Sequence, residues 1–287
     1  MKRSPLRYKT LAGFANQNVK FVSFNPRTDE QRVQHWKSFE RVRSGFYGRM
    51  TTRIRDALLD QRGIVMENVN GVRRPGDIPL AVRAGLKKIR PPYEQAIREL
   101  YVQVVSTFAD LTEESFPKAY SFVGHSKADT VWDDAANGYV TQEGGTLIVE
   151  PNATMKRIME EATRAAVRQG LEEGWGIPRI AEQIRVLSNN AVSEHRAVVI
   201  ARTETIRASN FGAMEAGRRS GLSLNKEWIA TADDRVRETH DAAHSQVVRM
   251  NEKFVVGGYP CRFPADAMLP AHESIQCRCT VAFIPIT

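Results

Sequence analysis

The feature that most constrains the fold is a change of hydrophobic period late in the 287-residue chain. Over much of Thr28–Gly221, apolar residues recur every three or four positions, which is the period of helices that bury one face. From residue 223 onward, short β-like runs are separated by glycine and proline, which is typical of strands joined by tight turns. We therefore predict an α+β fold, with a mainly helical part first and a small antiparallel sheet at the C-terminus.

The first helix signal is a capping box, in which Thr28 is followed three residues later by Gln31. The helical period continues from there to about Gln61. Gly45 and Gly48 have low helix propensity, so we expect them to break this helix in two.

Glycine and proline recur over residues 62–79, which predicts a loop or a short hairpin. Pro92 suits the first turn of a second helix, which we expect to run to about Leu111. The run Thr146–Val149 indicates a strand or an extended linker. Further helices are predicted over 154–173, from Pro178, and over 193–220, with Ser193 as N-cap and Gly221 as terminator.

Charge is distributed unevenly along the chain, whose formal net charge is +8. Residues 1–100 hold 21 Lys/Arg against 9 Asp/Glu, a net +12, and the remainder carries −4. Such a basic block suits contact with nucleic acid or with an acidic protein surface, and charge alone leaves both open. We expect three parts: an extended basic arm over 1–28, a mainly helical region over 29–150, and an α+β domain over 151–287.

Several classes of protein are not expected. No run approaches the roughly 18 apolar residues of a membrane span, and the basic N-terminus lacks the apolar run of a secretion signal. Walker, Rossmann and zincin motifs are missing, so no cofactor is expected apart from the zinc discussed below. The three cysteines do not form a disulfide framework, which fits a reducing cytoplasm.

Glu204 lies on the otherwise apolar stripe of the helix predicted over 193–220. A buried carboxylate needs a cation or several donors. Residues 233–240 are interpreted as a helical turn that places Asp233, Arg237 and His240 on one face. We expect Arg237 to pair with Glu204 and lock the fold. The alternative is an active-site carboxylate that works with Arg237 and His240.

Four side chains have the chemistry of a zinc site. His240 and His244 stand four residues apart, and Cys277 and Cys279 form a Cys-x-Cys pair. Two imidazoles and two thiolates are a common ligand set for structural zinc, with His272 as a further candidate. The alternative is a pair of buried thiols in a terminal strand, with the histidines on the surface.

The order of these pieces resembles the phage Mu F-like, or minor head protein, family. The resemblance covers about 80 residues and departs at Gln276, where the family has asparagine. It rests on Ala201-Arg202-Thr203-Glu204, Asn210, Trp228, Asp234-x-x-Arg237-x-x-His240, Phe254, Gly257-Gly258, Pro264-x-Asp266 and Gln276-Cys277-Arg278-Cys279.

The resemblance implies a structural component of a tailed-phage virion. Such proteins assemble in several copies with the portal and other head proteins at one vertex, first in the host cytoplasm and then inside the capsid. They contribute to head assembly, DNA packaging or DNA ejection, so packaged double-stranded DNA is a further expected contact. The alternative is a nucleic-acid-processing enzyme, RNase-like or transferase-like. The expected signature is structural and comprises Arg202, Glu204, Asp234, Arg237, His240, Cys277 and Cys279.

Overall fold

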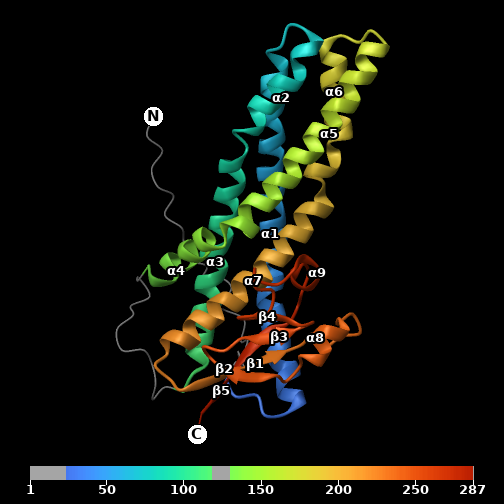
Figure 1. Ribbon diagram of the computed structural model, residues 1–287. Coiled ribbons are helices and arrows are strands. Elements are labelled where there is room, and N and C mark those ends of the chain that lie inside the picture. The colour runs from blue at the N-terminus through green and yellow to red at the C-terminus, as the bar shows by residue number, and fades with distance from the viewer. Residues whose placement is uncertain (1–23, 118–129, 287) are drawn as a thin grey trace.

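The computed structural model describes residues 24–117 and 130–286, which form an elongated helical rod with a compact β-containing unit at one end (Figure 1). None of the described helices is both long and apolar enough to cross a membrane. The long helices are α1 (Asp29–Asn70), α2 (Ile78–Leu86), α3 (Arg90–Ser115), α4 (Val131–Gln142), α5 (Glu150–Glu172), α6 (Ile177–Leu187) and α7 (Glu194–Arg219).

Helix α1 spans 42 residues, about 60 Å at 1.5 Å per residue. The predicted capping box is confirmed, because Thr28 accepts from the backbone of Gln31 and the Gln31 side chain accepts in return. The expected break at Gly45 and Gly48 is wrong. Each glycine costs only about 1 kcal/mol relative to alanine, and burial of the apolar face of α1 outweighs that cost. Buried apolar residues of α1 include Phe39, Phe46, Met50, Ile54, Leu58, Val65 and Val69.

The loop or hairpin expected over 62–79 is also wrong for most of its length. Helix α1 continues to Asn70, and a short 3-10 turn, η1 (Pro75–Asp77), leads directly into α2. Gly63 and Gly76 have open space around them, and Gly71 is the C-cap of α1. The close contact between α1 and α2 is at Gly85, where an added Cβ would come within 2.7 Å of the Val65 Cα atom. The helix predicted over 92–111 is confirmed as the central part of α3.

The strand or linker expected at Thr146–Val149 is wrong. These residues belong to a π-helical turn, η3 (Gly145–Val149), in which the N–H of Glu150 bonds to the carbonyl of Gly145. Leu147 and Ile148 are buried in the core, so tertiary packing decided the conformation of an ambiguous apolar run. Helix α5 follows without interruption. Residues 1–23 of the expected basic arm lie outside the described residues, and the division of roles among the three expected parts stays a prediction.

The predicted start and end of α7 are confirmed. The Ser193 side chain accepts from the N–H of Arg196 at 3.3 Å, and Gly221 follows the helix with φ +70°, a conformation that favours glycine. A 3-10 turn, η4 (Asn189–Val192), precedes this cap. Gly212 of α7 lies so close to α3 that an added Cβ would come within 2.5 Å of the Val105 carbonyl oxygen.

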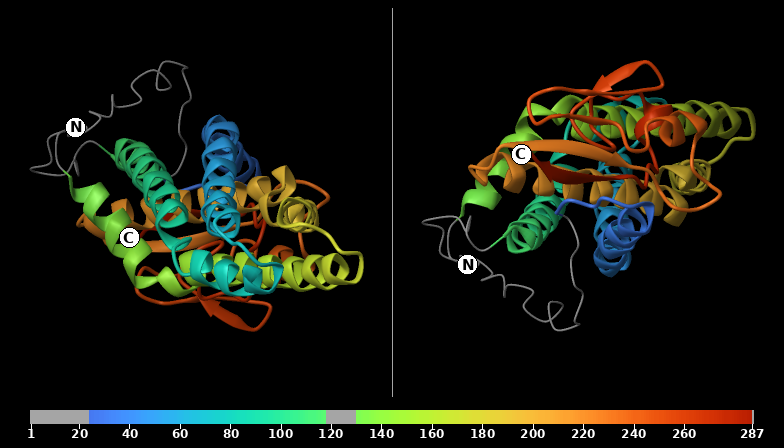
Figure 2. Two further views of the ribbon diagram at one scale, coloured as in Figure 1. Left: turned by 90° about the horizontal axis from the view of Figure 1, so that it is seen from above. Right: turned by 90° about the horizontal axis from the view of Figure 1, so that it is seen from below.

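The C-terminal strands confirm the predicted α+β class. A three-stranded antiparallel sheet has the order β2-β1-β5, and β3 pairs with β4 in a separate hairpin. Figure 2 shows the sheet with the hairpin on one side and α7 on the other. The elements are β1 (Leu224–Ile229), α8 (Glu238–Ala242), β2 (Val247–Arg249), β3 (Phe254–Val256), β4 (Tyr259–Cys261), α9 (Ala271–Ser274) and β5 (Thr280–Pro285).

Candidate metal centre and the polar network around it

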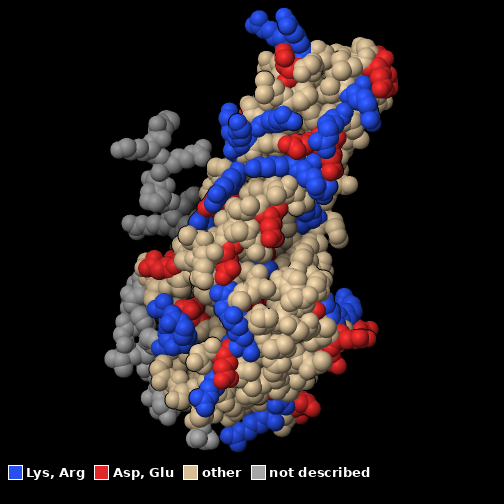
Figure 3. All heavy atoms as spheres, in the orientation of Figure 1, with Lys and Arg blue, Asp and Glu red and all other residues tan. Residues whose placement is uncertain are grey.

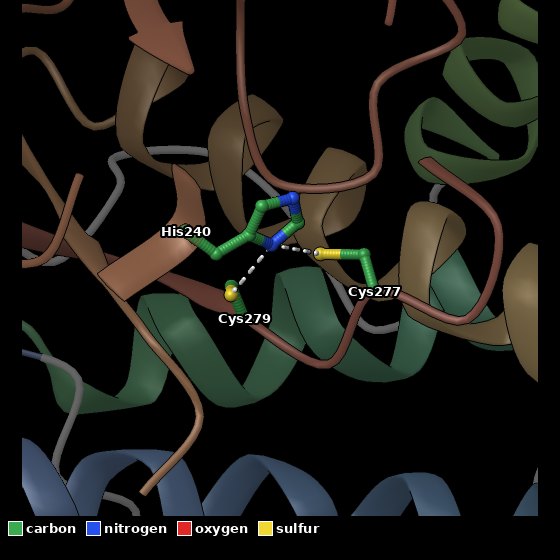
Figure 4. A group of neighbouring side chains, drawn as sticks. All are labelled: His240, Cys277 and Cys279. Atoms are coloured by element: carbon green, nitrogen blue, oxygen red, sulfur yellow. Dashed lines mark hydrogen bonds between the residues drawn. The ribbon is translucent and has the colours of Figure 1, made fainter. Parts of the chain in front are cut away.

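His240, Cys277 and Cys279 meet inside the C-terminal unit, as their side chains in Figure 4 show. The Nδ1 atom of His240 lies 3.3 Å from the Cys279 sulfur and 3.7 Å from the Cys277 sulfur. Each of the three residues is only 1% exposed. Helix α8 carries the histidine, and the segment between α9 and β5 carries both thiols. One imidazole nitrogen therefore faces two sulfurs in a buried space.

The other nitrogen of His240 is held by Glu273, a residue that the sequence did not single out for this site. Its carboxylate lies 2.9 Å from Nε2 and also accepts from the Thr239 hydroxyl at 2.9 Å. Gly257, at φ +57°, leaves room for this carboxylate, because an added Cβ would come within 2.5 Å of it. The Trp228 ring packs edge-on against the imidazole with centroids 5.6 Å apart. The ring of His240 is therefore fixed in orientation.

The buried environment and the contacts among these side chains shift the pKa values of the two thiols in opposite directions. Burial acts to raise the pKa of Cys277, but hydrogen bonds with Cys279 and His240 lower that pKa well below its ordinary value. Burial, and then the neighbouring Cys277, raise the pKa of Cys279 well above its ordinary value. Burial lowers the pKa of His240, but Cys277 and Glu273 more than offset this and raise it. The three side chains therefore shift one another's pKa values through direct contact.

The four-ligand set predicted from sequence is corrected in one member. His244 does not join the cluster, because α8 ends at Ala242 and the expected helical face does not continue. Its Nδ1 instead accepts from the N–H of Ala230 at 3.1 Å. The further candidate, His272, is exposed, and its Nε2 lies 3.9 Å from Glu273. Of the predicted ligands, the structure brings together His240, Cys277 and Cys279.

The predicted pairing of Glu204 with Arg237 is wrong. Glu204 is buried as expected, but both of its oxygens accept from Arg207, one turn along α7, at 2.7 Å. Tyr101 of α3 donates to the same carboxylate at 2.8 Å. Burial acts to lower the pKa of Arg207, but the Glu204 charge more than offsets this and raises it. The carboxylate is neutralised within its own helix and needs no distant cation.

Arg237 lies away from Glu204 because residues 233–237 are not helical, so the expected common face with Asp233 and His240 does not form. Arg237 donates to the Ile275 carbonyl at 2.6 Å. Asp233 forms an ion pair with Arg278, with the second Nη atom 2.7 Å from Oδ1. Two other signature residues, Arg202 and Asp234, are exposed, and Arg202 lies over the Tyr47 ring.

A second buried cation joins the start of α1 to the C-terminal unit. Arg43 donates to Ser209 at 2.8 Å and to Asn210 at 3.2 Å, and it also reaches the carbonyl of Cys279 at 3.4 Å. Asn210 in turn donates to that carbonyl and accepts from the N–H of Val281. The burial of Arg43 was not predicted, although the residue lies on the apolar stripe of α1, which is the same signal that marked Glu204.

A family model matches the C-terminal part of the chain. Residues 161–282 match the family described as "Phage Mu protein F like protein". The chain is 32% identical over 114 residues to a protein of Enterococcus faecalis named NAD(+)--arginine ADP-ribosyltransferase EFV. That alignment covers 39% of this chain and 23% of the relative. No solved structure matches the chain significantly.

The family match begins within α5 and ends within β5, so it spans α7, the Glu204–Arg207 pair and the His240–Cys277–Cys279 cluster. The pair and the cluster lie within the matched segment, whereas Arg43 and Tyr101 contact that segment from α1 and α3, outside it. This match supports a role in phage head morphogenesis. Residues 161–282 therefore form a domain similar to the phage Mu protein F like family.

Proposed function

We propose that this chain is a minor head protein of a tailed phage, which docks on the portal vertex during prohead assembly and contacts packaged DNA through its basic helical part. The observation that carries the proposal is the family match over 161–282. The polar contacts of that segment support a structural role, because its most conspicuous buried carboxylate is fully occupied by Arg207 and Tyr101.

The surface of the rod supports a nucleic-acid or acidic-protein contact. In Figure 3, Lys and Arg side chains gather over the half of the rod that α2 and α5 form. Helices α2 and α5 pack side by side, so the basic residues on them share one surface. Positive charge on a long surface suits the phosphate backbone, which dominates sequence-independent DNA binding. Exposed basic residues on and next to these helices are Arg83, Lys87, Lys88, Lys156, Arg157, Arg164 and Arg168.

Portal docking is tested by co-producing the full chain with the portal protein of the same phage and isolating the complex by an affinity tag on the portal. We expect this protein to co-purify at a fixed ratio to the portal. The major capsid protein, produced with the tagged chain but without portal, serves as the control. Failure to co-purify at physiological salt would contradict the docking proposal.

DNA contact is tested by measuring the affinity of the full chain for double-stranded DNA over a range of salt. We expect log K to fall linearly with log salt. Exchanging both Arg164 and Arg168 for Glu is expected to weaken binding and reduce this slope, whereas Lys253→Glu, an exposed lysine beside β3, leaves both unchanged. Equal effects of the two changes would place the DNA contact elsewhere.

An enzymatic role is the second candidate, because a relative is named as an ADP-ribosyltransferase. The catalytic set suggested by the sequence is not assembled, since Glu204 pairs with Arg207 and Arg237 bonds to the Ile275 carbonyl. We therefore expect no transfer of label from NAD⁺ to arginine that depends on Glu204. Transfer by the wild-type chain that disappears in Glu204→Gln, while the variant remains folded, would establish the enzyme.

A further inference from the structure

The strongest unexplained feature is the pair of buried sulfurs that face one imidazole nitrogen. A neutral imidazole whose Nε2–H donates to Glu273 has a bare lone pair at Nδ1. That lone pair accepts one S–H hydrogen bond well, but two sulfurs lie beside it, at 3.3 and 3.7 Å. A single cation between the three atoms would satisfy all of them at once.

The distances fit such a cation. With Zn–S near 2.3 Å, Zn–N near 2.0–2.1 Å and tetrahedral angles, the nitrogen and each sulfur of a zinc site stand about 3.6 Å apart. The two observed separations, 3.3 and 3.7 Å, lie on either side of that value. The three ligand atoms all lie within 4.8 Å of one another.

The surroundings of His240 also match those of a ligand histidine. Metal-binding imidazoles generally donate their second N–H to a carboxylate, which fixes the ring and raises its basicity. Glu273 does this here, and it is itself held by Thr239 and is 4% exposed. A cation on the far side of the ring would balance the charge of this buried carboxylate.

A nucleophilic role for Cys277 fits the geometry less well. A Cys–His–Glu relay would need one thiol, and the second sulfur at 3.3 Å would have no part in it. Both cysteines are 1% exposed, whereas reactive cysteines lie in partly exposed positions. Two buried cysteines beside one imidazole suit a metal ion that prefers sulfur and nitrogen ligands.

We propose that His240 Nδ1, Cys277 Sγ and Cys279 Sγ bind one zinc-class ion, with Glu273 orienting the histidine and a water or other small ligand completing the coordination. Cys261, the third buried thiol, does not join the ligand group within that 4.8 Å distance. Binding replaces the protons of the thiols, so up to two protons are released per ion when both cysteines start as thiols. The ion ties α8 to the segment that precedes β5, and this holds whether or not the chain docks on a portal.

The first experiment measures metal in the full-length chain purified without chelator and without a thiol reductant. We expect one equivalent of zinc per chain. The metal-free chain is then titrated with cobalt(II), which is expected to give thiolate charge-transfer bands and tetrahedral d–d bands that zinc abolishes. Less than a tenth of an equivalent of zinc, together with no cobalt–thiolate spectrum in the reduced chain, would overturn the proposal.

Variants separate the proposed ligands from their neighbours. Cys277→Ser and Cys279→Ser are expected to lose stoichiometric binding, whereas Cys261→Ser and His244→Asn, which leave the ligand set intact, keep it. Glu273→Gln should keep the spectrum but weaken affinity 10- to 100-fold, the range found when a partner of a ligand histidine is changed. Equal loss in Cys261→Ser would overturn the assignment.

Alkylation gives a readout that does not depend on whether a variant folds. In the wild-type chain, zinc is expected to slow the reaction of iodoacetamide with Cys277 and Cys279 relative to the metal-free chain, and to leave Cys261 unaffected. Peptide mapping by mass spectrometry assigns each modified cysteine. Unchanged rates at both proposed ligands would contradict metal binding there.

Discussion

The two ends of the rod are stabilised in different ways. We call residues 78–86 and 155–187 the tip, and residues 24–46, 93–116 and 200–286 the base. The tip is held by apolar packing, with Met159, Ile180 and Ile184 buried. The base buries charged side chains, and among the described residues α2, α5 and α6 bury none. Buried charged residues of the base are Arg43, Glu204, Arg207, Lys226, Glu227, Asp266 and Glu273.

Large apolar side chains are exposed at both ends, for example Leu80 at the tip (72%) and Val255 at the base (53%). The difference therefore lies in the interior, where the described residues of the tip have no buried ion pair. Apolar packing tolerates substitution of similar volume, whereas each buried charge requires particular partners. We therefore expect the loss of a single polar partner at the base to lower the free energy of unfolding strongly. At the tip, we expect the free energy of unfolding to depend mainly on side-chain volume.

The largest expected effect comes from removing the cation that neutralises Glu204. Arg207→Ala leaves a buried carboxylate without its partner, so we expect a loss of roughly 3–5 kcal/mol in the free energy of unfolding. Urea denaturation measures it. Arg168→Ala, at an exposed position of the tip, should change stability by less than about 0.5 kcal/mol. An equally large loss of unfolding free energy in Arg237→Ala would instead support the Glu204–Arg237 pairing that the sequence suggested.

The next effect concerns the junction between α1 and the C-terminal unit. Arg43→Ala leaves Asn210, Ser209 and a backbone carbonyl without their donor and creates a cavity, so we expect a loss of about 3 kcal/mol. Arg41→Ala, an exposed change two residues away, is the control. A similar effect of both changes in chemical denaturation would argue against the buried network.

Glycine substitutions compare packing at the two ends directly. At the base, Gly212→Ala brings a Cβ within 2.5 Å of the Val105 carbonyl oxygen, and we expect a loss of about 1–3 kcal/mol. At the tip, Gly170→Ala meets the Ile180 side chain, which can shift, so its cost should be smaller. Gly48→Ala meets nothing within 4 Å and should stabilise α1 by about 0.5–1 kcal/mol. Thermal unfolding should rank Gly48→Ala as the most stable variant and Gly212→Ala as the least stable. The reverse order would contradict the tighter packing proposed for the base.

The smallest expected effect is a pH dependence at the base. The hydrogen bond from Arg278 lowers the pKa of Asp233 from 3.8 to about 2. A carboxylate with a depressed folded-state pKa contributes stability above pH 4, and this contribution is lost as pH falls from about 4 to about 2. Because Asp233 is partly exposed, we expect only about 1 kcal/mol. Denaturation of Asp233→Asn across this range should lack the change, whereas the exposed control Asp234→Asn should retain it.

The fold and the site were predictable to different degrees. Helix starts at Thr28 and Ser193 and the stop at Gly221 were correct because caps act within three or four residues. The continuity of α1 through Gly45 and Gly48 was missed, because it rests on packing against other helices rather than on local propensity.

At the site, the sequence identified side chains that require a particular partner when they are buried. Glu204 stood on an apolar stripe, and the cysteines and His240 had the chemistry of metal ligands. Only the tertiary structure decided the partners, because these depend on where the chain returns after long intervals. His240 meets Cys279 across 39 residues, and Arg43 meets Asn210 across 167. Glu204 shows the converse, since its partner Arg207 lies three residues away and a remote one was expected. The chemistry of a buried side chain determines which kind of partner it requires. The packing of α1, α7 and β5 determines which residue supplies that partner.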